Sequence, residues 1–190
     1  MQPISQILSF GNDNPQIAII TGANKAGKST SLCAYATAVV LAQTLAIVPA
    51  THCILTPFAS IKTGFNMTAR VNHGQSLFSA SIDFAHDILD YARAKKGSHI
   101  LVIVDELFNS TDFEKGCAIV QKFAQELQQC PSCIALIATH FASLTELEEE
   151  NPHKFKNYKA EYLDQLRYQI IPGISDAHHV LSLAGQSVLL

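Results

Sequence analysis

The chain has 190 residues, of which 48% are hydrophobic and 15% charged, a composition that fits one folded domain and excludes a disordered chain. Thirteen Lys and Arg against sixteen Asp and Glu give a formal charge of -3, so we expect this chain alone to bind DNA weakly. Five cysteines, an odd number, favour reduced thiols and a cytoplasmic protein over a disulfide framework.

The first predicted unit is a strand, a glycine-rich loop and a helix. Residues 17–21, IAIIT, form a short β-branched run, and the alanine-rich segment from Ser29 to about Leu45 is typical of a helix. The stretch 33–50 has about the length of a membrane span. Because it contains polar side chains and directly follows the loop, we interpret it as a buried helix and expect no membrane contact.

The rest of the chain alternates helices and strands, although residues 52–58 and 60–68 are too mixed to assign. The patterns predict a helix at 79–94, a buried strand at 99–105, a helix at 115–128, a buried strand at 134–139 and a short acidic helix at 143–149. Later segments are expected to be an exposed loop at 151–159, a strand pair or a strand and turn at 161–171, and a helix at 176–183. This alternation indicates an α/β fold with a mainly parallel sheet flanked by helices, and ligands at the carboxyl ends of the strands.

The strongest motif is the loop GANKAGKS at residues 22–29, which matches the P-loop pattern G-x-x-x-x-G-K-[ST] between a strand and a helix. Its glycines let backbone N–H groups point at phosphate oxygens, and the following helix adds its positive N-terminal end. We expect Lys28 to contact the β and γ phosphates of ATP and the Ser29 hydroxyl to bind Mg²⁺. The predicted nucleotide-binding residues are Gly22, Ala23, Asn24, Lys25, Ala26, Gly27, Lys28, Ser29 and Thr30.

Three further side chains follow the predicted buried strands. Asp105 is expected to hold Mg²⁺, and Glu106 to orient or deprotonate the attacking water. An acidic pair at this place can also simply end a strand and cap a helix. His140 follows the strand at 134–139, at the edge of the sheet where it could sense a γ-phosphate, although a lone histidine there is more often structural. The predicted catalytic residues are therefore Lys28, Glu106 and His140.

Five segments, in this order over about residues 18–147, resemble the ATPase domain (C-terminal domain) of the MutS DNA mismatch-repair family: GANKAGKST, LAQTLAIVPA, GQSLFS, ILVIVDE and IATHFASLTEL. The resemblance implies an ABC-type P-loop ATPase that forms a homodimer, with each nucleotide between two protomers. Asn24 matches the asparagine inside the family's P-loop. Ser76 aligns with the signature serine that reaches the γ-phosphate of the opposite protomer. Tyr168 falls near the residue that the family places against adenine.

The chain departs from the family in the turn after the acidic pair. Residues 107–111, LFNST, replace a glycine-arginine-glycine-threonine turn and keep only the threonine, which puts communication between two sites in doubt. Segments corresponding to mismatch-reading, connector, lever or clamp domains are missing, so DNA would be bound only through parts absent from this chain. We therefore expect residues 1–190 to be a single domain excised from, or truncated relative to, a longer protein.

Two hypotheses follow for the function. The first is hydrolysis of ATP to ADP and phosphate, with low activity in the isolated domain, coupled to conformational change and to DNA mismatch repair or related DNA binding. The alternative is a nucleotide-gated dimerisation module with little turnover, in a MutS paralogue not involved in repair. The altered turn favours the alternative, whereas the intact Asp105, Glu106 and His140 favour hydrolysis.

Overall fold

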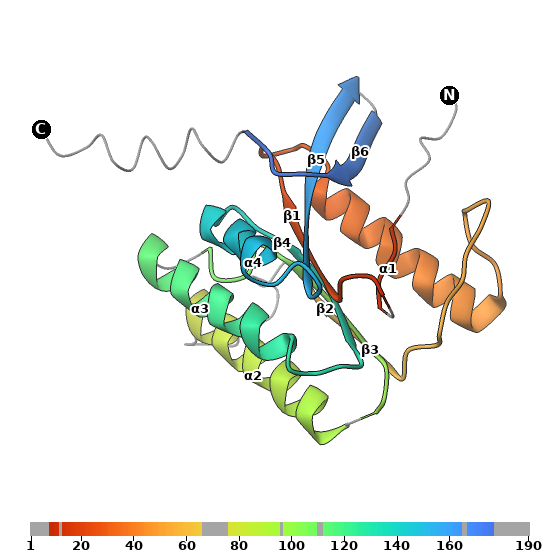
Figure 1. The fold of residues 1–190 in the computed structure, drawn as a ribbon, viewed down its shortest axis with the longest axis horizontal. Helices are drawn as coiled ribbons and strands as arrows, with labels where there is room; N and C mark the ends of the chain where they lie inside the picture. The colour runs from red at the N-terminus through yellow and green to blue at the C-terminus, as the bar shows by residue number, and fades with distance from the viewer. Residues whose placement is uncertain are drawn as a thin grey trace, which may run out of the picture.

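The structure, a computed structural model, describes residues 8–11, 13–65, 76–95, 97–109, 112–164 and 167–176. It has an α/β fold in which a mixed, six-stranded sheet is flanked by helices (Figure 1). The strands are β1 (Ile17–Thr21), β2 (Ser60–Gly64), β3 (Ile100–Asp105), β4 (Cys133–Ala138), β5 (Phe155–Asp164) and β6 (Arg167–Pro172). The helices are α1 (Lys28–Leu45), α2 (Leu77–Ala94), α3 (Phe113–Leu127) and α4 (Glu146–Glu150), with a 3-10 turn, η2 (Ala142–Thr145), before α4.

The order of the strands determines which loops meet. In the order β2-β3-β4-β1-β5-β6, every neighbouring pair is parallel except the hairpin of β5 and β6, which is antiparallel. The predicted sheet flanked by helices is confirmed, and the predicted strand pair near residues 161–171 is this hairpin. Since β3, β4 and β1 are adjacent and parallel, their carboxyl ends lie at one edge of the sheet.

The central strands are apolar because both faces of the sheet are covered. Successive side chains of a strand point to opposite faces, so Ile19 packs in the cluster beneath α2 and α3, whereas Ile20 packs in the cluster beneath α1. Figure 1 shows α1 on one side of the sheet and α2 and α3 on the other. Each such isoleucine contributes about 1.5–3 kcal/mol when fully buried. The two clusters hold the strand ends at fixed positions relative to one another.

Two parts of the sheet were not predicted. The mixed segment 60–68 contains β2, a half-buried edge strand that pairs with β3. The prediction of an exposed loop at 151–159 is wrong, because β5 begins at Phe155, which is 1% exposed, and pairs with β1. Its polar residues are accommodated by α4, where Glu148 accepts a hydrogen bond from Lys156 Nζ at 2.6 Å and another from the backbone N–H of Asn157 at 2.8 Å.

The prediction that α1 is a buried helix is half right. The segment is helical, but its buried residues are Lys28, Ser31 and Leu32, and Leu45 is 62% exposed. Only one side of α1 packs on the sheet, so its outer side faces away from the core. Across the described ranges, no helix combines the length and the apolar character that a membrane span requires. The helix predicted at 176–183 lies outside the described residues, apart from Asp176.

Candidate functional site

The motif at residues 22–29 contains the loop that connects β1 to α1 and the first two residues of α1, and it depends on two glycines. Gly27 has a φ of 90°, a left-handed conformation, and a Cβ atom added there would lie 2.5 Å from Tyr168 Cγ. At Gly22 an added Cβ would lie 2.9 Å from the Ala160 carbonyl oxygen of β5. The loop is therefore pressed against the β5–β6 hairpin. Tyr168, predicted to contact adenine, lies here against the loop itself.

Replacing Gly27 tests how closely the loop and hairpin pack. Gly27→Ala is expected to lower the free energy of unfolding by about 1–3 kcal/mol, because the methyl group meets the Tyr168 ring and the backbone conformation disfavours alanine. Urea unfolding followed by circular dichroism measures this change. Gly97→Ala is the control, since Gly97 has a φ of 85° but an added Cβ there meets nothing within 4 Å. Equal losses in the two variants would show that the Tyr168 contact is unimportant.

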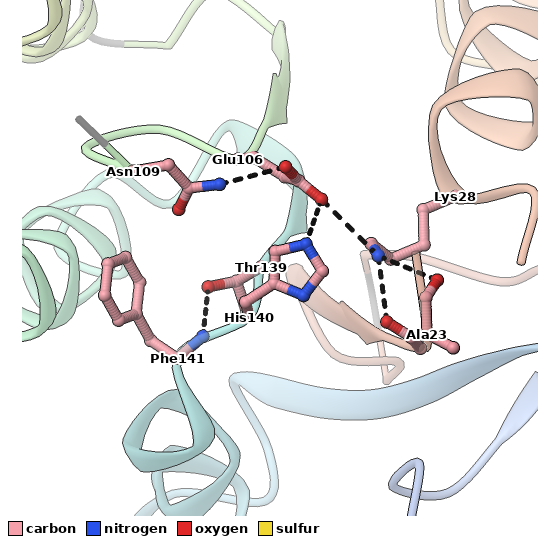
Figure 2. Close-up of polar contacts among 8 residues, drawn as sticks. Ala23, Lys28, Glu106, Asn109, Thr139, His140 and Phe141 are labelled. Carbon is pink, nitrogen blue, oxygen red and sulfur yellow. Dashed lines mark hydrogen bonds and ion pairs between the residues drawn. The ribbon is translucent and has the colours of Figure 1, made fainter. Parts of the chain in front are cut away.

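Lys28 is the buried cation of the loop, with only 4% of its side chain exposed. Its Nζ donates hydrogen bonds to the carbonyl oxygens of Gly22 at 2.9 Å and Ala23 at 3.3 Å, and lies 3.4 Å from Glu106 Oε1 (Figure 2). Burial lowers the pKa of the Lys28 ammonium, while the negative charges of Glu106 and Asp105 oppose that shift. The ammonium group thus has three oxygen partners contributed by the loop and by the end of β3.

Glu106 follows β3 and is the centre of the polar cluster (Figure 2). Its Oε1 lies beside Lys28 and accepts a hydrogen bond from His140 Nε2, and its Oε2 accepts one from Asn109 Nδ2 at 2.9 Å. The hydrogen bond from His140 is the largest cause that lowers the pKa of the Glu106 carboxyl, although burial opposes it. Glu106 is consequently held as a carboxylate, the form that can accept a proton.

Asp105 and Ser29 form a second polar pair beside this cluster. The Ser29 hydroxyl donates a hydrogen bond to the Asp105 carboxylate, yet burial dominates and raises the pKa of Asp105. Within the described residues, the buried Oδ1 of Asp105 has no hydrogen-bond partner. A buried carboxylate oxygen without a partner is costly unless a ligand completes it. A hydroxyl and a carboxylate side by side suit Mg²⁺, which prefers oxygen ligands.

The structure thus gathers most of the predicted site residues, but not all of them. Lys28 and His140 each contact Glu106, and Asp105 and Ser29 lie next to this group. Ser76 instead caps the N-terminus of α2, where its Oγ accepts a hydrogen bond from the backbone N–H of Ser79 at 3.1 Å. Among the predicted nucleotide-binding residues, Ala23, Asn24, Lys25 and Thr30 are exposed, whereas Ala26 is buried.

Two residues of the site, Asn109 and Thr139, are not identified as site residues by the sequence patterns. The sequence identifies Asn109 only as part of an altered turn, and the one signal for its contact is that an amide follows the carboxylate by three residues. Thr139 precedes His140, and its hydroxyl accepts a hydrogen bond from the backbone N–H of Phe141 at 3.0 Å. Because the backbone N–H of Thr139 also donates to Ile20 O at 3.0 Å, the end of β4 is tied to β1. These two hydrogen bonds hold the backbone on both sides of His140 in place.

Comparison with known proteins finds one family model and several DNA mismatch repair proteins that are similar to this chain. The family MutS domain V matches residues 18–187, so the likeness covers β5 and β6 as well, which corrects the narrower extent of about 18–147 expected from the motifs. The chain is 32% identical to the DNA mismatch repair protein Msh3 of Dictyostelium discoideum, over 89% of this chain and 12% of that protein. It is 34% identical to the DNA mismatch repair protein MutS of Treponema denticola, over 97% of this chain and 22% of that protein.

A human protein is similar to the chain to about the same degree. The chain is 34% identical to the DNA mismatch repair protein Msh6 of Homo sapiens, over 74% of this chain and 10% of that protein. The chain therefore spans between 10% and 22% of the length of these three relatives. Since the domain V match covers most of the chain, the protein belongs to the MutS family, of which it carries domain V.

Proposed function

We propose that this chain is a P-loop ATPase domain of the ABC type that binds ATP with Mg²⁺ and hydrolyses it to ADP and phosphate. The observation that carries the proposal is the meeting of Lys28, Glu106 and His140 at the carboxyl ends of three adjacent parallel strands, β1, β3 and β4. The edge of an open α/β sheet is where such folds bind their ligands. The glycine-rich loop supplies backbone N–H groups for phosphate at the same edge.

Each side chain has a role in this proposal. Lys28 binds the β and γ phosphates, and Glu106 orients the attacking water and accepts its proton. His140 holds Glu106 Oε1 and keeps the carboxylate ionised. Ser29 and Asp105 would hold Mg²⁺, which fits the unpartnered Oδ1 of Asp105. When bound, that ion would neutralise charge on the phosphate oxygens.

Nucleotide binding requires Lys28 to change partners. Its ammonium now donates to the carbonyl oxygens of Gly22 and Ala23, and phosphate oxygens would replace these acceptors with charged ones. The same exchange would draw Lys28 away from Glu106 Oε1 and leave that oxygen accessible to water. Measuring phosphate release from Mg-ATP by the purified chain tests the proposal directly. A chain that binds no ATP at millimolar concentrations would contradict it.

A nucleotide-gated dimerisation module with little turnover is the second candidate. The observation in its favour is the turn after Glu106, in which Phe108 has a left-handed φ of 69° and is 1% exposed. A buried aromatic side chain makes this turn stiffer than the glycine-rich turn that the resemblance implies. Steady-state rates distinguish the candidates, because the module predicts ATP binding without phosphate release above background.

The biological role is proposed from the relatives. Those compared above are DNA mismatch repair proteins, and we propose that ATP binding and hydrolysis drive conformational change in mismatch repair or in related DNA binding. A MutS paralogue with another task is the alternative. DNA would be held by parts absent from this chain, which agrees with its net charge of -3.

We also propose that ATP promotes a homodimer in which Ser76 of one protomer completes the site around Lys28 of the other. Ser76→Arg should abolish ATP-dependent dimers of Glu106→Gln at hundreds of micromolar, because a long cation would occupy the shared site. Analytical ultracentrifugation measures the association. Gln129→Arg, which adds the same charge at an exposed position between α3 and β4, is the control and should still dimerise.

Two outcomes would rule out the shared site. One is a Glu106→Gln protein that stays monomeric with Mg-ATP at these concentrations. The other is a dimer that Ser76→Arg leaves unchanged. Because Ser76 also caps α2, the substitution removes a cap worth about 1 kcal/mol, so thermal unfolding must confirm that the variant is folded.

A further inference from the structure

Glu106 has a partner on each carboxylate oxygen, and one partner belongs to no motif. Oε1 faces the motif residues Lys28 and His140, whereas Oε2 accepts a hydrogen bond at 2.9 Å from the amide of Asn109 (Figure 2). We propose that Asn109 is a positioning residue, which fixes the orientation of Glu106 for water activation. This inference rests on the proposed ATP hydrolysis and deepens it.

The turn between these two residues explains why Asn109 reaches back to Glu106. Glu106 and Phe108 both have positive φ angles, 54° and 69°, which are unusual for residues with side chains. Such conformations cost about 1–3 kcal/mol each and persist where the surroundings enforce them. Leu107 is 2% exposed and Phe108 is 1% exposed, and the Phe108 ring packs edge-on against Phe78 with centroids 6.3 Å apart.

Burial of these two side chains therefore holds the turn in its strained shape. The backbone N–H of Glu106 donates to Ala138 O at 3.0 Å, which ties the start of the turn to the end of β4. With its start bonded and its middle buried, the turn holds the exposed Asn109 side chain within reach of Oε2. The contact is thus a product of a fixed backbone, not of a chance encounter between surface groups.

The hydrogen bond matters because a carboxylate rotates easily. The last torsion of a glutamate side chain has a broad, roughly two-fold distribution, so a glutamate held on one oxygen can turn. In the free protein Lys28 and His140 both restrain Oε1, but the proposed nucleotide would attract Lys28. Asn109 and His140 would then remain as the two restraints. Asn109 keeps Oε2 occupied, so that Oε1 stays directed toward the phosphate loop.

The prediction for Asn109→Ala is a fall in kcat of about tenfold, the scale of one hydrogen bond to a charged group. The Kd for ATP, measured by calorimetry, should stay unchanged, because Asn109 contacts Glu106 and not the phosphate loop. Asn109→Asp keeps the size of the side chain but removes the donor and adds a repelling charge. Its kcat should be at least as low as that of Asn109→Ala.

A double-mutant cycle separates positioning from general damage. Because Asn109 acts through Glu106, Asn109→Ala should have no further effect on kcat when Glu106 is already Gln. Asn14→Ala makes the same change at an exposed asparagine that is far from Asn109 in the sequence. It serves as the control and should retain wild-type kcat. Thermal unfolding of each variant checks that it is folded.

Three results would overturn the inference. The first is wild-type kcat in Asn109→Ala, beside a Glu106→Gln variant that is impaired. The second is an equal loss of kcat from Asn109→Ala in the wild-type and in the Glu106→Gln background, which would mean that Asn109 does not act through Glu106. The third is a wild-type chain that hydrolyses no ATP, which would overturn the proposed function and this inference with it. The first two results leave the proposed function intact.

Discussion

Glu106→Gln is expected to lower the rate of ATP hydrolysis by about a hundredfold or more while leaving nucleotide binding in place. The amide keeps the size of the side chain but cannot accept a proton from water. His140 and Lys28, which lower the pKa of the Glu106 carboxyl, would then face a neutral group. Single-turnover phosphate release gives the rate, and calorimetric titration with ATP gives the affinity.

Glu149→Gln is the matched control for this prediction. Glu149 is an exposed residue of α4, and the same neutralisation there should not change the rate. A Glu106→Gln variant that hydrolyses ATP at the wild-type rate would make Glu106 a structural residue. The water would then have to be activated by His140 or by other waters.

The parts of the fold that the sequence predicts are those with a local signal. Strands β1, β3 and β4 are continuous apolar runs, because both of their faces are covered by helices, and each was placed within one or two residues. Strand β5 has no such run. Its lysines are tolerated because each has an acidic partner: Lys159 pairs with Glu161 of the same strand, and Lys156 pairs with Glu148 of α4, which the pattern of the strand itself does not reveal.

The candidate site shows the same division between local and distant signals. The loop at 22–29 is recognisable because its glycines and lysine have fixed spacing along the chain. The contact of Asn109 with Glu106 depends on a positive φ at Phe108, where a bulky side chain ordinarily disfavours that conformation. Such a turn is stable only when Phe108 is buried, so the tertiary packing determines its conformation and the local sequence does not.

The position of Tyr168 was also beyond local inference. Its ring lies against Gly27 and 4.9 Å from the ring of Tyr162, measured between centroids, because the β5–β6 hairpin folds beside the loop that contains Gly27. That arrangement follows from the pairing of β5 with β1, and the sequence indicated a loop where β5 begins. The wrong assignment of residues 151–159 to a loop therefore also concealed the contact between Tyr168 and Gly27.

Lys28→Ala is expected to weaken ATP binding by about 2 kcal/mol or more, which is roughly thirtyfold in Kd. Lys28 is 4% exposed, so its contact with the phosphates would form with little competition from water. The loss should leave the fold intact, because Glu106 retains His140 and Asn109 as hydrogen-bond partners. Alanine also removes the ammonium group that now connects the carbonyl oxygens of the loop to the Glu106 carboxylate.

Calorimetric titration with Mg-ATP measures the effect, and circular dichroism confirms that Lys28→Ala is folded. Lys122→Ala, which removes an exposed ammonium from α3, is the control for a general loss of positive charge and should bind ATP like the wild type. The comparison matters because the chain has a net charge of -3, so removing any cation weakens the attraction of an anion slightly. Equal affinities in Lys28→Ala and the wild type would mean that ATP does not bind at this loop. A loss shared by Lys28→Ala and Lys122→Ala would assign the effect to net charge instead of to a buried contact with phosphate.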